Sequence, residues 1–532
     1  MCRLRRHVEN RRIQQDMPPA AAYGMELGMA NDKRELMIYI HIPYCIRKCL
    51  YCDFLSFGKG SSQWESIDKY IDTLCHEIKF YKEYSKDRIV TSVFIGGGTP
   101  SVLTNSQADK LFAAIRSGFM LSKDCEFTIE CNPGTLTADK LKLYRTNGVN
   151  RISLGLQSAD NAELKVLGRI HTFEDFARSF DAVREAGFEN VNVDLMSAIP
   201  GQTMKNWENT LIKTLSFKPE HISAYSLIIE EETPFYDMYC EAGGRCEAVG
   251  NLEAGKGCEA GGDRVLKLPD EDTEREIYHF TKDFLGENGY YRYEISNYSL
   301  PGYECRHNSG YWQGKDYLGL GLGAASLFEG RRYANVRELE AYLEAVDKAR
   351  DKVIDKTENN STDKAGDKAV DKDEDKVGNK TVDKAGDKTV DKVVDKAGDK
   401  TVDKTEEPEN AGLVLQADNG AQALPFADKD EQALQTADKK SVQASPWVDE
   451  ETIQLLSQKE RMEEFMFLGL RMCKGISMAD FKKCFGKNIY DIYGEVLGRL
   501  MSEGLIEQQD DFLRLTDYGV DLSNYVLAEF LL

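Results

Sequence analysis

The chain has 532 residues, which allows a large hydrophobic core and more than one domain. Its formal net charge of -22 disfavours binding to the phosphate backbone of nucleic acids. No run of about eighteen apolar residues occurs, so no transmembrane segment is expected. Thirteen cysteines in a long chain without a secretory signal indicate free thiols or metal ligands, and hence a reducing cytoplasm.

The first 35 residues are basic but lack an apolar stretch, as in "MCRLRRHVENRRIQQ". This pattern excludes a secretory signal and favours a disordered extension over residues 1–35.

Six short β-rich runs then alternate with amphipathic stretches such as 107–119 and 173–187. Repeated strand–helix–strand units predict right-handed parallel β/α connections. We therefore expect an α/β fold, a partial (β/α)6 barrel spanning 36–346, with chemistry at the carboxyl ends of its strands. The predicted strands cover 36–42, 91–97, 126–132, 150–157, 190–196 and 221–229.

Two segments do not fit a compact domain. Residues 240–263 are rich in glycine and contain Cys240, Cys246 and Cys258, whose wide spacing favours a loop over a second metal site. Residues 347–447 include a repeated Asp-Lys tetrapeptide whose period drifts by about 40° per repeat on a helix. We predict a long, disordered, low-complexity insertion there, with a charged spacer for an unknown partner as the alternative.

Order is predicted to return at 448–532. Met462, Phe465 and Gly469 lie on one helical stripe, and two further helical patterns, a short hairpin at 505–515 and a last helix follow. The pattern predicts a winged-helix-like module. Winged helices often bind DNA, but the acidity of this chain favours a structural cap on the barrel.

Three cysteines follow the first predicted strand in "HIPYCIRKCLYCDF", as Cys45, Cys49 and Cys52. Thiolates suit iron–sulfur clusters and zinc alike. A structural zinc site usually has four ligands, and a closed four-thiolate cluster would need another cysteine, of which Cys75 is the next along the chain. Three thiolates therefore indicate a [4Fe-4S] cluster with one open iron.

This spacing resembles the signature of radical S-adenosylmethionine (SAM) proteins. The resemblance implies that SAM chelates the open iron and that the reduced cluster cleaves it to a 5′-deoxyadenosyl radical. "FIGGGTPS" resembles the glycine loop that holds the methionyl amine in such proteins, and its glycines permit a close backbone approach. A tight turn is the alternative.

Further motifs at or near strand ends resemble the oxygen-independent coproporphyrinogen III oxidase family over roughly 37–240 and 264–335, and the C-terminal module looks similar too. The resemblance implies that Tyr39, Gly97 and Glu130 contact the SAM on the cluster. Positions that contact a second SAM in the oxidase are matched by Tyr51, Gly98, Thr99, Gln157, Arg169 and Asp194.

The residue type at the position of Phe54 distinguishes two branches of the family. The oxidase carries a fourth cysteine two residues after the third, whereas the branch of radical SAM heme chaperones carries phenylalanine, as this chain does. Phenylalanine cannot ligate iron or transfer a proton. The alternative to its interpretation as a marker of the chaperone branch is that Phe54 merely packs against its neighbours.

A second feature is similar to the chaperone branch. "HNSGYW" matches that branch's H-N-x-x-Y-W heme motif and implies heme contacts from His307, Asn308, Tyr311 and Trp312. Histidine can ligate heme iron and aromatic rings can cover a macrocycle, although a structural role for His307 is the alternative. Cys305 is a further candidate ligand, and Ala325 replaces a histidine that is common in the branch.

The sequence thus favours a heme chaperone with a [4Fe-4S] cluster, exchangeable SAM and bound heme, which it passes to an acceptor protein, for example a respiratory enzyme at the membrane. An oxygen-independent coproporphyrinogen III oxidase is the alternative, and a structural zinc protein is a third candidate. Whether SAM is cleaved, and whether the chain is a monomer or a dimer, stay open.

Overall fold

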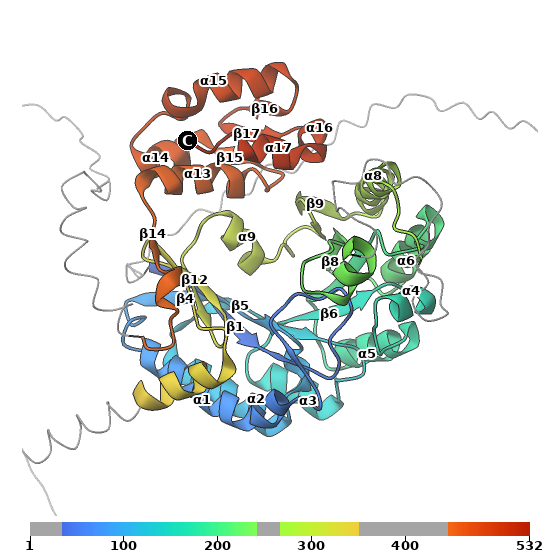
Figure 1. Ribbon diagram of the computed structural model, residues 1–532. Helices are drawn as coiled ribbons and strands as arrows, with labels where there is room; N and C mark the ends of the chain where they lie inside the picture. Colours follow the sequence, from blue (N-terminus) through green and yellow to red (C-terminus); the bar gives the residue numbers. More distant parts are fainter. Residues whose placement is uncertain (1–33, 242–265, 350–444) are drawn as a thin grey trace, which may run out of the picture.

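The computed structural model describes residues 34–241, 266–349 and 445–532 (Figure 1). The predicted N-terminal extension lies outside the described residues except at its end. So do most of the glycine-rich segment 240–263 and most of the Asp-Lys segment 347–447.

Six parallel strands form the centre of the fold, each joined to the next by one or more helices. Every predicted strand is present within a few residues of its expected bounds. The two predicted helices correspond to α2 (Asn105–Gly118) and α5 (Phe173–Glu185). The prediction of β/α units is therefore confirmed. The strands are β1 (Arg34–Ile42), β4 (Arg88–Gly97), β5 (Leu121–Cys131), β6 (Arg151–Gln157), β7 (Val191–Ser197) and β8 (His221–Ser226). The connecting helices are α1 (Ile67–Tyr81), α2 (Asn105–Gly118), α3 (Ala138–Thr146), α4 (Asn161–Val166), α5 (Phe173–Glu185) and α6 (Met204–Ser216).

These strands belong to one twelve-stranded sheet in the order β14-β13-β12-β11-β1-β4-β5-β6-β7-β8-β10-β9. β11 extends the parallel part beside β1, and the other additions are antiparallel. The sheet therefore runs on past both sides of the six-stranded unit. The added strands are β9 (Tyr291–Glu294), β10 (Asn297–Ser299), β11 (Tyr317–Leu320), β12 (Ala325–Phe328), β13 (Arg331–Ala334) and β14 (Gln454–Leu455).

The two faces of the curved sheet differ in chemistry. The outer face carries the helices α1–α6 (Figure 1) and the main hydrophobic core, to which Ile38, Ile40, Val93 and Ile95 contribute. The alternate residues of the same strands point inward, because successive strand side chains face opposite sides. Many of these are polar: Glu126, Glu130, Arg151, Ser153, Asn192, Asp194 and His221.

A short helix, α9 (Arg306–Trp312), lies on this inner face (Figure 1). A Cβ added to Gly310 would lie 2.2 Å from Met37 Sδ on β1, so glycine permits the close approach of α9 to the sheet. Glu126 on β5 accepts hydrogen bonds from the backbone N–H groups of Arg306 and His307, at 2.9 and 3.0 Å. These contacts satisfy the first amides of the helix.

The C-terminal residues have the element order and three-stranded sheet of a winged helix, as predicted. They have their own hydrophobic cluster, which includes Met466, Phe481 and Leu497. The elements are α13 (Gln458–Gly469), β15 (Ile476–Ser477), α14 (Met478–Phe485), α15 (Ile489–Ser502), β16 (Ile506–Gln509), β17 (Phe512–Leu515), α16 (Asp517–Asp521) and α17 (Ser523–Ala528).

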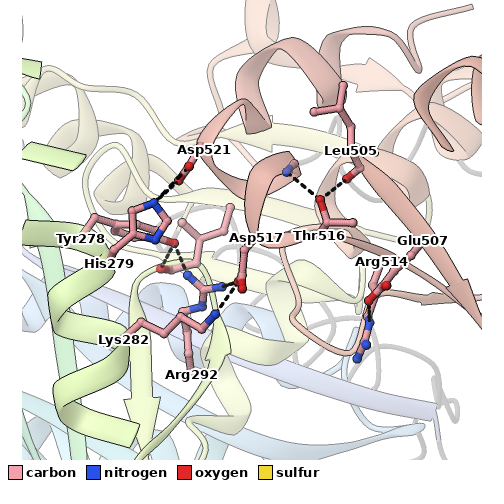
Figure 2. A network of polar contacts seen from close by, with 12 residues as sticks. Tyr278, His279, Lys282, Arg292, Leu505, Glu507, Arg514, Thr516, Asp517 and Asp521 are labelled. Carbon is pink, nitrogen blue, oxygen red and sulfur yellow. Dashed lines mark hydrogen bonds and ion pairs between the residues drawn. The ribbon is translucent and has the colours of Figure 1, made fainter. Parts of the chain in front are cut away.

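Polar contacts join this module to α8 (Glu271–Glu287) and β9 (Figure 2). Asp517 forms ion pairs with Lys282 and Arg292, and Asp521 lies 3.0 Å from His279 Nε2. The backbone of Cys473 also donates to Tyr293 O at 2.9 Å. The module is thus attached to the antiparallel edge of the barrel sheet. None of the helices within 34–241, 266–349 and 445–532 has the length and apolar character to cross a bilayer.

A buried carboxyl group ties α1 to the segments that follow β11 and β13. Glu77 accepts hydrogen bonds from Gly321 N at 2.9 Å, from Asn335 Nδ2 at 2.8 Å and from the Tyr342 hydroxyl. Burial raises the pKa of Glu77 to about 7. The group is therefore neutral in mildly acidic solution and becomes a buried anion as the pH rises.

We expect Glu77→Ala to lower the free energy of unfolding by about 2 kcal/mol, because buried donors lose their acceptor. Glu77→Gln tests the ionisation. The pKa of Glu77 is higher in the folded state than its value of about 4.5 in the unfolded state. The stability that the neutral carboxyl contributes is therefore fully present below about pH 4.5 and is lost as the pH rises toward 7. The stability difference between wild type and Glu77→Gln should be larger at pH 5 than at pH 8 in urea unfolding. Equal differences would contradict this.

Candidate functional site

The cysteine triplet lies in a loop at the carboxyl end of β1. The short strands β2 (Tyr44–Cys45) and β3 (Phe57–Gly58) pair in parallel and close the loop at its base. Cys45 is buried, and Cys49 and Cys52 are partly exposed. The loop thus places all three free thiols at the mouth of the barrel, where sequence reasoning expected them.

Two residues from other parts of the barrel donate hydrogen bonds to these thiols. Thr99 Oγ1 lies 3.3 Å from Cys45 Sγ, and Arg169 Nη1 lies 3.4 Å from Cys49 Sγ. Arg169 is itself held by Asn132 Oδ1 at 2.9 Å and Gly155 O at 3.1 Å. Donors of this kind orient a sulfur ligand and stabilise it as a thiolate.

Burial raises the pKa of Cys45 and raises that of Cys52 to about 11. Both thiols therefore carry their protons at neutral pH, and binding to iron would release them. Within the described residues, no three His, Cys, Asp or Glu side chains converge on one point as a single metal ion requires. A cubane distributes three thiolates over three irons, so the donor set suits a cluster better than one zinc ion.

The three glycines at the end of β4 and just after it are required by packing within the protein. Gly97 has a φ of 108°, and a Cβ on it would lie 2.5 Å from the His41 ring. A Cβ on Gly98 would lie 2.9 Å from Ile42 O, and one on Gly96 would lie 2.9 Å from Glu130 Oε2. These close approaches are to His41 and Ile42 at the end of β1 and to Glu130 on β5, and a close approach to a ligand stays a prediction.

Glu130 connects the glycine loop to the interior of the barrel. Its Oε2 accepts a hydrogen bond from Gly97 N at 3.1 Å. Burial raises its pKa to about 8, with the charge of nearby Asp194 as the second cause. Tyr39 lies beside it on β1 and shares a 3.0 Å hydrogen bond with His41 Nδ1. Glu130 is thus a neutral carboxyl at pH 7 that a bound cation would ionise.

The remaining polar residues of the predicted ring face the same interior. Asp194 accepts hydrogen bonds from Ser153 at 2.9 Å and Asn192 at 2.7 Å, and burial raises its pKa. Gln157 has a φ of 64°, and its buried Oε1 has no partner within the described part of the chain. A buried oxygen without a partner is costly, so this atom fits a site whose ligand supplies a donor. Tyr51 packs toward Phe235, with ring centroids 6.5 Å apart, and lies near Arg169 and Cys49.

Phe54 does not pack into the protein. It is 62% exposed, so it is not part of the hydrophobic core. Ile46 and Ile170 are also exposed, and both line a small cavity beside Cys49. The exposed rim of the cysteine loop thus carries apolar side chains among the charged residues Arg47, Lys48 and Asp53, and no thiol stands at the fourth motif position.

His307 is buried, with only 2% of its surface exposed. Its Nδ1 lies 2.9 Å from Ser92 Oγ and its Nε2 lies 3.0 Å from the Tyr311 hydroxyl. Burial lowers its pKa to about 3, and the positive charge of Arg151 adds to the effect. The imidazole is thus neutral, and both ring nitrogens are engaged in the conformation described.

The other residues of the motif lie along the same helix. Trp312 is at the end of α9, and the Arg471 guanidinium lies 4.3 Å from its ring centroid. Asn308 lies near Tyr293, whose hydroxyl it contacts. Cys305 is buried, and burial raises its pKa to about 12, so it is a neutral thiol. Ala325 is exposed at the start of β12.

Sequence reasoning missed several residues that hold this site together. Asn132 fixes Arg169, and Glu126 and Ser92 hold α9 in place. Asn132 has a sequence signal, since it is a polar residue directly after a buried strand. For Glu126 and Ser92 the only sequence signal is the alternation of residues along their strands. This alternation does not identify their partner, which lies in a helix about 200 residues away.

Comparisons with known proteins agree with this architecture. The profile of the radical SAM superfamily matches residues 39–213, and that of the HemN C-terminal domain matches residues 456–522. The solved structure of coproporphyrinogen III oxidase (HemN) from Escherichia coli superposes with a TM-score of 0.63. That comparison covers 94% of this chain and 90% of the other at 18% identity, so it establishes the fold alone.

The curated relatives are more specific. Heme chaperone HemW of Lactococcus lactis subsp. lactis is 31% identical over 494 residues, which cover 93% of this chain and 97% of that protein. Heme chaperone HemW of Bacillus subtilis is 29% identical over 494 residues, and covers 93% and 98%. Heme chaperone HemW of Escherichia coli is 37% identical over 290 residues, which cover 54% and 69%. The chain therefore belongs to the HemW-type branch of radical SAM proteins, within the oxygen-independent coproporphyrinogen III oxidase family.

Proposed function

We propose that this chain is a heme chaperone of the cytoplasm. It would hold a [4Fe-4S] cluster through Cys45, Cys49 and Cys52, bind SAM at the barrel mouth, carry heme and pass it to an acceptor protein. The observation that carries the proposal is Phe54, an exposed phenylalanine at the position where the oxidase has a fourth cysteine. The curated relatives that match most of the chain are themselves named heme chaperones.

The donor set fits the cluster. Three thiolates can bind three irons and leave the fourth iron for SAM, and the bound cluster supplies an electron to the SAM sulfonium. Thr99 and Arg169 donate to two of the thiols and would orient these ligands. Both residues match positions that contact a second SAM in the oxidase. Their hydrogen bonds to the thiols give them another role here, which does not require a second SAM.

Tyr39, Gly97 and Glu130 would position the methionyl end of the SAM on the cluster. Glu130 would accept an N–H of the methionyl amine, and the positive charge of the iron-bound amine and the sulfonium would favour loss of the Glu130 proton. Gln157 Oε1, which has no partner among the described residues, would accept a donor from the ligand. Tyr51, Gly98, Asp194, Thr99 and Arg169 complete the proposed set around the mouth.

The proposed heme contacts are His307, Asn308, Tyr311 and Trp312 of α9. Ligation of heme iron by His307 Nε2 requires the Tyr311 hydroxyl to release that nitrogen, because the two atoms lie 3.0 Å apart. Heme binding at this position thus depends on a movement of Tyr311 or of α9.

Cys49→Ser should abolish the brown colour and the broad visible absorption of the anaerobically reconstituted protein, because one iron loses its thiolate. The control is Cys484→Ser, which removes an exposed free thiol in the C-terminal module. Equal iron and sulfide content in the two variants would refute the cluster assignment. Conversion of coproporphyrinogen III to protoporphyrinogen IX by the reconstituted wild type would favour the oxidase instead.

Glu130→Gln should weaken SAM binding by about tenfold or more, because a charge-assisted hydrogen bond is lost. The pKa of Glu130 is raised to about 8, so its carboxyl must lose a proton before it accepts a charge-assisted hydrogen bond from the iron-bound amine. Wild-type affinity for SAM should therefore rise with pH up to about 8, and the variant should lack this rise. Isothermal titration at pH 6.5 and 8.5 measures both effects, with Glu220→Gln as control because Glu220 pairs with Arg184 instead. A variant with the wild-type pH profile would contradict the assignment.

His307→Ala and Tyr311→Phe should change heme affinity in opposite directions. The first variant removes the proposed iron ligand and should weaken binding. The second variant removes the Tyr311 hydroxyl that is hydrogen-bonded to His307 Nε2. It should strengthen heme binding about two- to tenfold, because this hydrogen bond no longer has to break before the nitrogen can ligate iron. Titration followed at the Soret band measures both, and unchanged binding in the two variants would remove His307 from the site.

A further inference from the structure

A groove separates the barrel from the C-terminal module and lies outside the site described above. It has a volume of about 840 Å³ and is lined by residues of α8, β9, β17 and α16. Pockets of a few hundred to a thousand Å³ are typical of sites for cofactors and other small molecules. The groove is thus large enough to hold a ligand of that class.

The charges that line the groove differ in sign from the rest of the protein. Lys282, Arg292, Arg471 and Arg514 face two carboxylates, Glu507 and Asp517. Figure 2 shows Asp517 between Lys282 and Arg292, while Arg514 pairs with Glu507. The lining therefore has a surplus of two positive charges in a chain whose net charge is -22.

Two arginines of the groove retain unused hydrogen-bonding capacity. The side chain of Arg292 is only 8% exposed, and its Nε has no partner within the described residues. The buried Nε of Arg471 has none either in that part of the chain. Arg292 also donates to the Tyr278 hydroxyl at 2.6 Å, and Arg471 is half-buried. Both Nε atoms are covered by protein, so a carboxylate ligand in the groove would satisfy their costly unpaired N–H groups after a shift of each guanidinium.

Much of the remaining lining is apolar, apart from groups such as the Thr516 hydroxyl. Leu470, Met472, Leu515 and Val520 come from the module, and Ile295 and Pro301 come from the barrel side. Arg471 also contacts the ring of Trp312, the last residue of α9. The groove therefore combines an apolar surface and an aromatic neighbour with cationic groups, which suits a flat apolar body that carries carboxylates.

We propose that this groove binds the carboxylate groups of the heme cargo, with Arg292 and Arg471 as their partners and Trp312 beside the macrocycle. The proposal rests on the function proposed above, and it identifies how the cargo is anchored. His307 lies five residues before Trp312, about 7.5 Å along α9, so the groove and the imidazole are separate parts of the molecule. The groove also gives the C-terminal module a role in cargo binding.

The experiment compares ferric heme with its dimethyl ester, in which both carboxylates are blocked, in the full-length protein. Wild type should bind heme about tenfold more tightly than the ester, because the ester cannot form charge-assisted bonds to arginine. Arg471→Gln should lose that preference, with affinity for heme reduced about tenfold and affinity for the ester unchanged.

Arg292→Lys is the second variant, because it keeps the charge that pairs with Asp517 and removes Nε. It should weaken heme binding several-fold while the thermal unfolding temperature stays close to that of the wild type. The matched control is Arg499→Gln, which removes an exposed arginine paired with Glu529 in the same module, outside the groove.

Equal affinity for heme and ester in the wild type would overturn the groove assignment. So would an Arg471→Gln protein that behaves like Arg499→Gln. If His307→Ala abolished heme binding while the groove variants bound normally, the groove would fail and the proposed function would stand. If the wild type bound neither compound, both proposals would fall.

Discussion

The seating of α9 on the inner face of the sheet is the contact on which the rest of the arrangement depends. Glu126 receives the first amides of the helix, and Gly310 lets its backbone approach β1. A buried carboxylate needs such donors, because an unsatisfied charge inside a protein is costly. At one end of the helix His307 is held between Ser92 and Tyr311, and at the other Trp312 meets Arg471 of the C-terminal module. One short helix thereby connects the barrel interior to the module.

The mouth of the barrel has a different physical character. Its thiols are held by single donors from distant strands and loops, such as Thr99 and Arg169. Two carboxyl groups nearby, Glu130 and Asp194, have pKa values raised by burial. Burying these polar groups is unfavourable in free energy, and a cationic ligand bound at the mouth would offset this by stabilising their ionised forms. An exposed rim that includes Phe54 then leaves the cysteine loop accessible from outside.

Much of the architecture was predictable because it depends on local patterns. The alternation of buried runs and amphipathic stretches predicted all six barrel strands, and the helices and hairpin near the C-terminus predicted the winged-helix elements. The cysteine spacing likewise placed its loop at a strand end. The partners of Glu77 and Glu126 were not predictable, because each carboxyl is satisfied by residues 180 or more positions away.

The sequence by itself determined the element order, the three thiols of the loop and the absence of a fourth at Phe54. These follow from residue type and spacing, which do not change when the chain folds. Only the tertiary structure decided the surroundings of each group. It exposed Phe54, engaged both nitrogens of His307 and, among the described residues, left Arg292 Nε beside a groove without a partner. Burial and hydrogen bonding are properties of neighbours, and the neighbours here come from segments that only the folded sheet brings together.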